Sequence, residues 1–166
     1  MALLKILKYP DPRLRIKAKR VTKIDSALRR VVADMYETMY DSQGVGLAAT
    51  QVDVHWRLFT MDLSEAHDQP ICIVNPEIVH LEGEQFESEG CLSVIDAWDK
   101  VKRAAKVILR GMDLESNPLE MEAEGLMAAC FQHEIDHLDG ILFVDHLSRL
   151  KRERIDKKIE KNNRQA

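Results

Sequence analysis

The stretch GLMAACFQHEIDHLDG, residues 125–140, decides the fold of this protein. Its first half is almost entirely apolar, which predicts a buried helix from Leu126 to about Asp139. Gly125 opens this helix, and Gly140 stands where a left-handed cap is expected to end it. A helix this apolar must be packed on most of its surface, so it is expected to be the central element of the fold.

The second half of the same helix carries a candidate metal site. His133 and His137 are four residues apart, so their side chains share one helical face and can bind one ion. Glu134 lies next to the first histidine. The alternative is a pair of core histidines with local hydrogen bonds, but imidazoles on so apolar a helix are costly without partners. A metal ion would supply those partners.

The third ligand of this site is not on the helix. Catalytic centres of this type usually have three protein ligands and one open position. A large class of metalloproteases has a glycine and then a third histidine after the second one; Gly140 matches, but Phe143 occupies the ligand position and cannot bind a metal. The third ligand is therefore a carboxylate or one of five other side chains: His55, His67, His80, His146 and Cys91.

Hydrophobic periodicity predicts the remaining elements. One helix runs from residue 25 or 26 to about 40, and the last runs from about 147 to the end. Short strands are expected between turn signals, at 57–62, 71–75, 77–81, 85–88, 101–109 and 119–123. Residues 44–46 are expected to be loop or irregular backbone. The fold class is α+β, with short antiparallel strands around a central metal-binding helix and with a C-terminal helix.

Composition is that of an ordinary globular protein. The chain has 166 residues, of which 45% are hydrophobic and 31% charged, enough for one domain with a substantial core. No apolar run approaches the roughly 20 residues of a membrane span, and no signal peptide is recognised. The three cysteines, Cys72, Cys91 and Cys130, are too sparse and odd in number for a disulfide framework. They favour a reducing compartment, and the cytoplasm is the expected location.

Charge is distributed unevenly along the chain. Residues 151–166 hold seven Lys/Arg and three Asp/Glu, a local charge of +4 in a protein whose net charge is −4. The sequence is therefore divided into a catalytic part, residues 1–147, and a charged C-terminal helix, residues 148–166. This tail is either a solvated helix with i,i+4 ion pairs or a docking element for a partner.

Three motifs lie along the chain: GVGLAATQ at 44–51, EGCLS at 89–93 and HEIDH at 133–137. In this order and spacing they resemble the signature motifs of the peptide deformylases, which remove the N-formyl group from nascent bacterial polypeptides. The resemblance extends from YPDPRLR near the start to the charged C-terminal helix. It implies that the third ligand is Cys91, and that Phe143 departs from the protease pattern because the chain is not a protease of that class.

The resemblance implies a metal centre made by Cys91, His133 and His137. The family usually works with Fe²⁺, and a thiolate beside two imidazoles also suits Zn²⁺, Ni²⁺ and Co²⁺. Water would take the fourth position, and its pKa would fall toward neutrality, so that hydroxide can attack the formyl carbon.

Catalytic roles for three further residues follow from the same resemblance. Glu134 would take the proton of the water and pass it to the leaving amine, as general base and then general acid. The oxyanion would be stabilised by the side-chain amide of Gln51 and by the backbone N–H of Leu92.

The substrate site is also implied by the family pattern. The main chain of residues 44–46 would pair with the substrate peptide as an added strand. A slot for the methionine side chain would lie near the metal, lined by Leu126, Ala129, Cys130 and Val45, with Gly44 and Gly46 at the peptide backbone. Glu89 and Arg103 would brace the metal loop by an ion pair. Asp136 is either a support for the metal ligands or a solvated carboxylate.

The chain departs from the family pattern beside the second motif. Ile95 stands where proline is usual, Trp98 where arginine is usual, and Lys102 replaces a second proline. The ligands and oxyanion donors are untouched, so the chemistry is expected to be retained. The rim of the substrate channel is expected to differ, since Trp98 there can stack on substrate, narrow the mouth or pack against the protein.

The function implied is hydrolysis of formyl-methionyl peptides to formate and a free N-terminal methionine. The partners would be formylated nascent peptides and the ribosome, which the basic tail would contact through ribosomal RNA near the exit of the nascent chain; a monomer is expected. One alternative is an HExxH peptidase, which has no use for EGCLS. The other is a deformylase-like protein with shifted substrate preference, or one that binds formyl-peptides without turnover.

Overall fold

The computed structural model describes residues 2–165 of the chain. Three α-helices are present in this range: α1 (Ser26–Asp41), α2 (Gly125–Leu138) and α3 (Arg149–Gln165). The strands of the same range are β1 (Gly46–Ala48), β2 (Leu58–Met61), β3 (Ile71–Glu82), β4 (Gln85–Cys91), β5 (Val94–Arg103), β6 (Lys106–Met112) and β7 (Pro118–Glu124). Short 3-10 turns occur at Pro12–Arg15 (η1), Ala49–Val52 (η2) and Phe143–His146 (η3).

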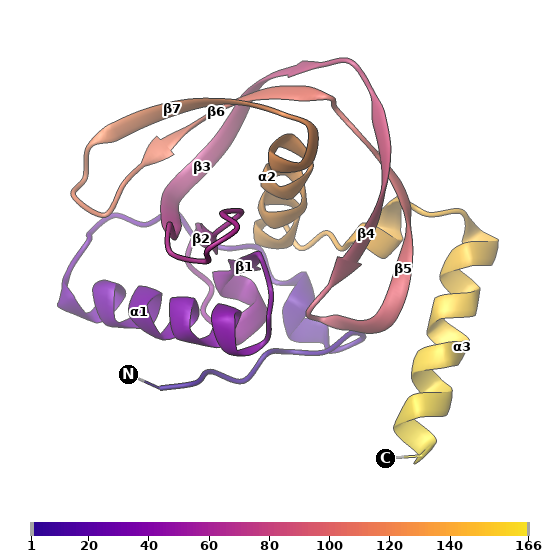
Figure 1. Ribbon diagram of the computed structural model, residues 1–166. Helices are drawn as coiled ribbons and strands as arrows, with labels where there is room; N and C mark the ends of the chain where they lie inside the picture. The colour runs from indigo at the N-terminus through magenta and orange to yellow at the C-terminus, as the bar shows by residue number, and fades with distance from the viewer. Residues whose placement is uncertain (1, 166) are drawn as a thin grey trace.

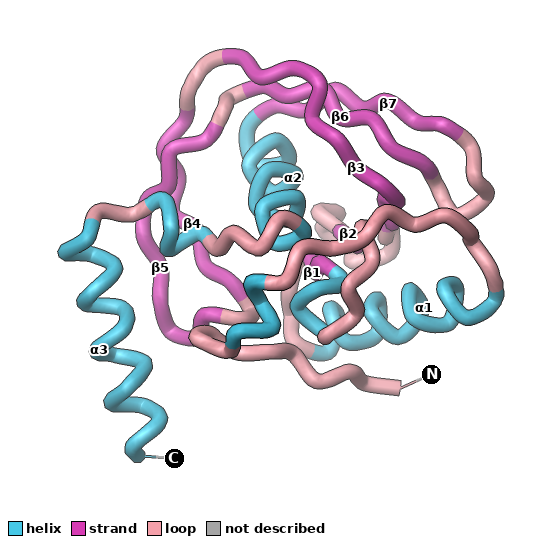
Figure 2. Tube along the Cα trace, turned by 180° about the vertical axis from the view of Figure 1, so that it is seen from behind, coloured by secondary structure: helices cyan, strands magenta, loops and turns pink. Residues whose placement is uncertain are grey.

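The strands form two antiparallel sheets around α2 (Figure 1). The larger sheet has the order β1-β2-β3-β6-β7, and the smaller sheet consists of β4 and β5. Strand β3 leads directly into β4, and β5 into β6, so these long ribbons curve over α2 from one sheet to the other. Helix α1 packs against β1 and β2, whereas α3 stands at the outside of the molecule (Figure 2). The expected α+β fold with a central helix and a C-terminal helix is confirmed.

Helix α1 forms for the reasons that its sequence indicates. Asp25 caps the N-terminus, because its side chain accepts a hydrogen bond from the Leu28 N–H at 2.9 Å. Such a cap typically contributes about 1 kcal/mol. The apolar stripe that includes Val32, Met35 and Met39 is buried in the core beneath β1 and β2. The predicted helix of residues 25 or 26 to 40 is therefore confirmed.

Helix α2 is bounded by two glycines in the left-handed region, Gly125 at φ 58° and Gly140 at φ 78°. A side chain at Gly140 would be strained by this φ, and its Cβ would lie 2.6 Å from the Arg15 carbonyl oxygen. The guanidinium of Arg15 donates to the Gly140 carbonyl at 3.0 Å, which ties this end of α2 to η1. The predicted boundaries of the helix are confirmed to within one residue.

Two predicted strands, 71–75 and 77–81, are one continuous strand, β3. The prediction was wrong because it took Asn75-Pro76 as a break. Asn75 adopts φ 53° and makes a bulge, with a register shift between Val74 and Glu77. Its side chain accepts from the Val21 N–H at 2.8 Å and donates to the Val21 carbonyl at 2.9 Å, so both backbone groups of Val21 are paired.

The predicted strand 101–109 was also wrong, because two strands meet within it. β5 ends at Arg103 and β6 begins at Lys106. Between them the Gln132 side chain accepts from the Ala104 N–H at 2.9 Å and donates to the Ala104 carbonyl at 3.0 Å, so this residue pairs with α2 and not with a strand. Residues 94–100 of β5 were missed, because the left-handed Asp96 breaks the alternation of inward and outward side chains.

The prediction that residues 44–46 are loop was only partly right. Gly46 is the first residue of β1 and pairs with Met61 of β2. A strand of three residues carries too little periodicity to be recognised in the sequence.

Helix α3 contributes Ile155 and Ile159 to a third core cluster, against Val94, Ala97 and Val101 of β5. The division of the chain at residue 147 thus separates elements that share one core. No helix in the described part of the chain is long and apolar enough to cross a membrane.

Candidate metal centre and active site

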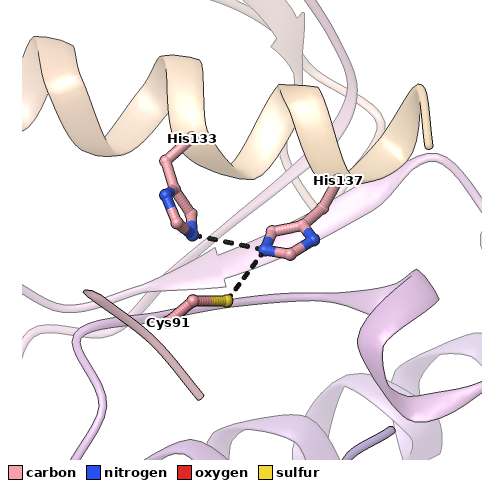
Figure 3. A group of neighbouring side chains, drawn as sticks. All are labelled: Cys91, His133 and His137. Atoms are coloured by element: carbon pink, nitrogen blue, oxygen red, sulfur yellow. Dashed lines mark hydrogen bonds between the residues drawn. The ribbon is translucent and has the colours of Figure 1, made fainter. Parts of the chain in front are cut away.

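Cys91, His133 and His137 converge at one point between α2 and the end of β4 (Figure 3). The helix presents both imidazoles from successive turns, and β4 brings the thiol from the smaller sheet. The His137 Nε2 lies 3.2 Å from the Cys91 Sγ and 3.2 Å from the His133 Nε2. All three ligand atoms lie within 4.8 Å of one another. The structure brings together the three residues expected to bind the metal.

This donor set fits a divalent cation. Bonds of about 2.0–2.3 Å from N and S ligands to a tetrahedral ion place the ligand atoms roughly 3.3–3.7 Å apart, close to the separations here. Nε2 of His133 carries a lone pair toward the site, because the His133 Nδ1 lies 2.9 Å from Glu89 Oε1 and is expected to donate to that carboxylate. One sulfur and two imidazole nitrogens directed at one point are a donor set that divalent transition-metal ions bind.

A chain of charged side chains holds the His133 ring in place. Glu89 accepts from Arg103 in two hydrogen bonds, at 2.8 and 2.9 Å, so the expected ion pair is present. Burial alone would raise the pKa of Glu89, but hydrogen bonds from Arg103 and His133 outweigh it and hold the pKa at about 2. Asp136 accepts from Arg103 at 2.6 Å and contacts His146 Nε2 at 2.8 Å. Asp136 is therefore part of the hydrogen-bonded network behind the metal ligands and is not simply a solvated carboxylate.

Glu134 is 4% exposed and lies beside the metal ligands at the base of a pocket. Its Oε1 has no hydrogen-bond partner among the described residues. Its other oxygen lies against Gly46, where any Cβ would overlap with it. Burial raises the pKa of this carboxyl to about 7. Glu134 is thus an unpaired carboxyl group held at the place where a proton carrier would be needed.

Gln51 is oriented by its own backbone neighbours. Its amide oxygen accepts from the Ala48 N–H at 2.9 Å, which turns the NH₂ group toward Ser93 Oγ at 3.1 Å and Cys91 Sγ at 3.6 Å. The buried Ser93 was missed in the sequence, although it ends the EGCLS motif. A second contact that was missed is the hydrogen bond from Thr50 Oγ1 to the His137 carbonyl at 3.1 Å.

A pocket of about 410 Å³ opens beside these groups. Every residue expected at the substrate site lines it: Gly44, Val45, Gly46, Trp98, Leu126, Ala129 and Cys130. Gln51, Cys91, Leu92, His133 and Glu134 line it as well, whereas the buried His137 does not. The pocket is also lined by four residues that were not predicted from the sequence: Gln43, Glu87, Ser88 and Gly90. The only feature of the sequence that could have indicated these four residues is that they lie beside or within the first two motifs.

Residues 3–153 match the family model described as polypeptide deformylase. The chain belongs to this family. The peptide deformylase of Alkalilimnicola ehrlichii is 56% identical over 167 aligned residues, which cover 100% of this chain and 94% of the relative. That of Pseudomonas aeruginosa is 53% identical over 99% of both chains.

Solved deformylase structures share this fold. A crystal structure of a peptide deformylase from Legionella pneumophila is 49% identical, with a TM-score of 0.93 over 98% of this chain and 96% of the other. The deformylase of Ehrlichia chaffeensis in complex with actinonin is 39% identical, with a TM-score of 0.94 over 99% of both chains. Membership of this family of metal-dependent hydrolases confirms that the chain is an enzyme, and it confirms the resemblance carried by the three motifs.

Proposed function

We propose that this deformylase hydrolyses the N-formyl group of formyl-methionyl nascent peptides and releases formate and a free N-terminal methionine. The observation that carries the proposal is the convergence of Cys91, His133 and His137 next to the unpaired carboxyl of Glu134, at the base of a pocket. We propose Fe²⁺ as the resident ion, with Zn²⁺, Ni²⁺ or Co²⁺ as functional substitutes, since the thiolate and imidazole donors suit all four.

In the proposed hydrolysis, each residue around the ion has a separate role. When bound, the ion supplies Lewis-acid activation of water and of the formyl oxygen. Glu134 takes a proton from the attacking water and delivers it to the departing amine. The NH₂ group of Gln51 and the N–H of Leu92 donate to the oxygen that gains negative charge. The hydrogen bond from Ala48 supports this role for Gln51, since it fixes the direction of the amide before substrate arrives.

The topology supports binding of the peptide as an added strand. β1 is the edge of the larger sheet, and β4 has a partner only on its β5 side within the described residues. Both strands border the pocket, through Gly46 and through Ser88 to Cys91. An extended peptide between these edges would gain main-chain hydrogen bonds from either side.

The walls of the pocket support a preference for methionine as the first residue. Leu126, Ala129 and Cys130 come from one face of α2, and Val45 approaches from the loop before β1. Burial raises the pKa of the Cys130 thiol to about 12, so this cysteine stays protonated and apolar at neutral pH. It therefore belongs to the wall and does not compete with Cys91 for the metal.

Formate release from formyl-Met-Ala-Ser under anaerobic conditions tests the proposed function. Formate should appear with added Fe²⁺ or Ni²⁺ and stop when a chelator is added. Cleavage of a peptide bond would support a peptidase instead, and binding without formate would indicate a non-catalytic module. Actinonin, which the Ehrlichia chaffeensis deformylase binds, should compete with the substrate.

Gly46→Ala should lower kcat about 100-fold, because the new Cβ overlaps with the Glu134 carboxylate and a displacement of about 1 Å can cost that much. Gly44→Ala is the matched control. There the new Cβ would lie 2.6 Å from Leu92 Cδ1, which can rotate away, so the loss should be on the order of tenfold or less. Steady-state kinetics of the two Ni²⁺-loaded variants test the difference; equal losses would mean that crowding of Glu134 is not the cause.

Trp98 is proposed as a recognition residue at the rim. It is 65% exposed and lines the pocket with Glu87 and Ser88, and its indole covers Gly90, where a Cβ would overlap with it. Trp98→Arg should shift the preference for the second and third substrate residues toward acidic side chains by about 2–5-fold, because an exposed ion pair contributes about 0.2–1 kcal/mol, while methionine remains preferred at the first. Values of kcat/KM over a peptide panel measure the shift. Identical profiles would mean that Trp98 only packs.

The C-terminal helix is proposed to contact ribosomal RNA. Three of its cations are held by the body of the protein, through Lys151 with Asp99, Arg152 with Asp145 and Lys158 with the Asp96 carbonyl. Arg149 pairs with Glu153 of the same helix. The other cations form no ion pair among the described residues and are free for phosphates: Arg154, Lys157, Lys161 and Arg164.

Replacing Arg154, Lys157 and Lys161 by Gln should reduce co-sedimentation with ribosomes about tenfold or more at low salt, because each phosphate contact adds to a steep salt dependence. The buried Ile155 and Ile159 stay in place, so formyl-peptide turnover should be unchanged. Undiminished co-sedimentation would show that α3 is not the docking element.

A further inference from the structure

A second basic surface lies far from α3 in the sequence. Residues 13–30 contain eight Lys/Arg and one Asp, a local charge of +7. With +4 in the tail and a net charge of −4, the remaining 132 residues carry −15. The extended part of this segment, from η1 to the start of α1, runs across the side of the molecule that faces the viewer in Figure 2. A cationic surface on an otherwise acidic protein is the charge pattern of a polyanion-binding site.

Within this surface there is a groove of about 220 Å³. Its lining combines cations with one large aromatic ring: Arg20, Val21, Thr22, Lys23, Asp25, Leu28 and Trp56. Trp56 is 38% exposed, so part of its indole is open to a ligand in the groove. We refer to this feature as the Trp56 groove.

The cations in and beside the groove are not used in ion pairs within the described part of the protein. Arg13, Arg15 and Arg29 of the same segment form ion pairs with Asp53, Asp145 and Glu115. Lys19, Arg20 and Lys23 are exposed and form no ion pair within residues 2–165. The one carboxylate in the lining, Asp25, is engaged as the cap of α1. The net charge of the lining is therefore positive and available to a ligand.

The backbone that carries these side chains is held firmly. The Lys19 N–H donates to the His55 carbonyl at 2.8 Å, and the Arg57 N–H donates to the Lys19 carbonyl at 2.8 Å, on either side of Trp56. Two residues after Lys19, both backbone groups of Val21 bond to the Asn75 side chain. The indole and the cations are thus presented at a fixed spacing, which reduces the entropic cost of binding a ligand across them.

We propose that the Trp56 groove binds a single-stranded segment of RNA. The phosphates would contact Arg20 and Lys23 in the groove and Lys19 at its edge, and one unpaired base would stack on the indole of Trp56. Cations beside an exposed aromatic face are the arrangement that single-stranded nucleic acid requires, since it offers both charge and π-faces. An acidic polypeptide would use the cations but leave the indole without a partner. This surface is separate from α3 and from the catalytic pocket.

The test uses the full-length chain with Trp98→Phe, which leaves Trp56 as the remaining one of the two tryptophans. A fluorescein-labelled 12-nucleotide RNA without secondary structure is titrated at 50–200 mM salt, and anisotropy and Trp56 fluorescence are both recorded. Binding with a Kd of about 10⁻⁶–10⁻⁴ M and quenching of Trp56 are expected. Turnover of formyl-Met-Ala-Ser, relative to the same parent, reports separately on the catalytic site.

Two groove variants give different expected results. Lys19→Gln/Arg20→Gln/Lys23→Gln should weaken binding at least tenfold and reduce the salt slope by about 2. Trp56→Leu should weaken binding about 5–100-fold with the slope unchanged. Both should keep the turnover of the parent. The matched control, Lys100→Gln/Lys102→Gln/Arg110→Gln, removes three exposed charges from strands β5 and β6 and should bind RNA like the parent.

Equal affinity in the groove variants and the strand control would overturn the proposal. So would binding that leaves Trp56 fluorescence unchanged. If polyglutamate competes as well as RNA of the same charge, the groove binds polyanions without regard to bases, and the assignment to RNA is wrong. None of these results depends on whether the chain releases formate, so failure of this proposal can be distinguished from failure of the proposed function.

Discussion

Glu134→Gln is expected to lower kcat by about 10²–10⁴ while the protein keeps its fold and its metal. The amide has the shape of the carboxylate but cannot accept a proton from water and pass it on. The side chain is nearly fully buried, and one of its oxygens has no partner among the described residues, so the substitution breaks no hydrogen bond to that atom. The loss should therefore appear in turnover and not in stability.

Three measurements on the Ni²⁺-loaded variant test this expectation: formate release, metal content and the midpoint of thermal unfolding. Glu134→Asp is a useful companion, because it keeps the charge but withdraws it by one methylene, and it should retain more activity than the amide. Turnover of Glu134→Gln close to that of the natural chain would remove this residue from the mechanism.

Cys91→Ala is expected to abolish both metal binding and turnover. It removes one of three donors and leaves two imidazoles, which make a weak site. Elemental analysis of the protein purified under anaerobic conditions should find about one transition-metal ion per natural chain and far less in the variant. The direct loss of metal separates this result from a defect in catalysis alone.

Cys130→Ala is the matched control, since this thiol lies in the same pocket but belongs to its wall. It should keep the metal and change mainly the fit of the first substrate side chain. Full metal occupancy in Cys91→Ala would show that the ligand assignment is wrong. Loss of the metal in Cys130→Ala would show the same.

The candidate site could be predicted from the sequence because its parts are short and local. Two histidines one helical turn apart share a face in any α-helix, so His133 and His137 needed no knowledge of the rest of the fold. Cys91 was one of several possible third ligands until the family resemblance selected it, since no local rule joins a cysteine at a strand end to a histidine 42 residues later. The structure then brought its sulfur within 3.2 Å of His137 Nε2.

The errors in the strands have one physical origin. The break expected at Asn75 and the continuity expected at Ala104 were both read from local turn and strand propensities. In the fold, Asn75 bonds to Val21 and Ala104 bonds to Gln132, residues 54 and 28 positions away. Hydrogen bonds to distant side chains can continue or interrupt a strand against its local preference, and no window of neighbouring residues contains them.

The sequence by itself determined the central helix, its metal-binding face and the glycines that bound it, because these depend on periodicity and backbone conformation over a few residues. Only the tertiary structure decided which groups surround that face. The contact of Gly46 with Glu134, the hold of Glu89 and Arg103 on His133, and the groove at Trp56 each join segments far apart in the chain. Such contacts depend on how curved sheets close around α2, and that packing is a property of all the elements together.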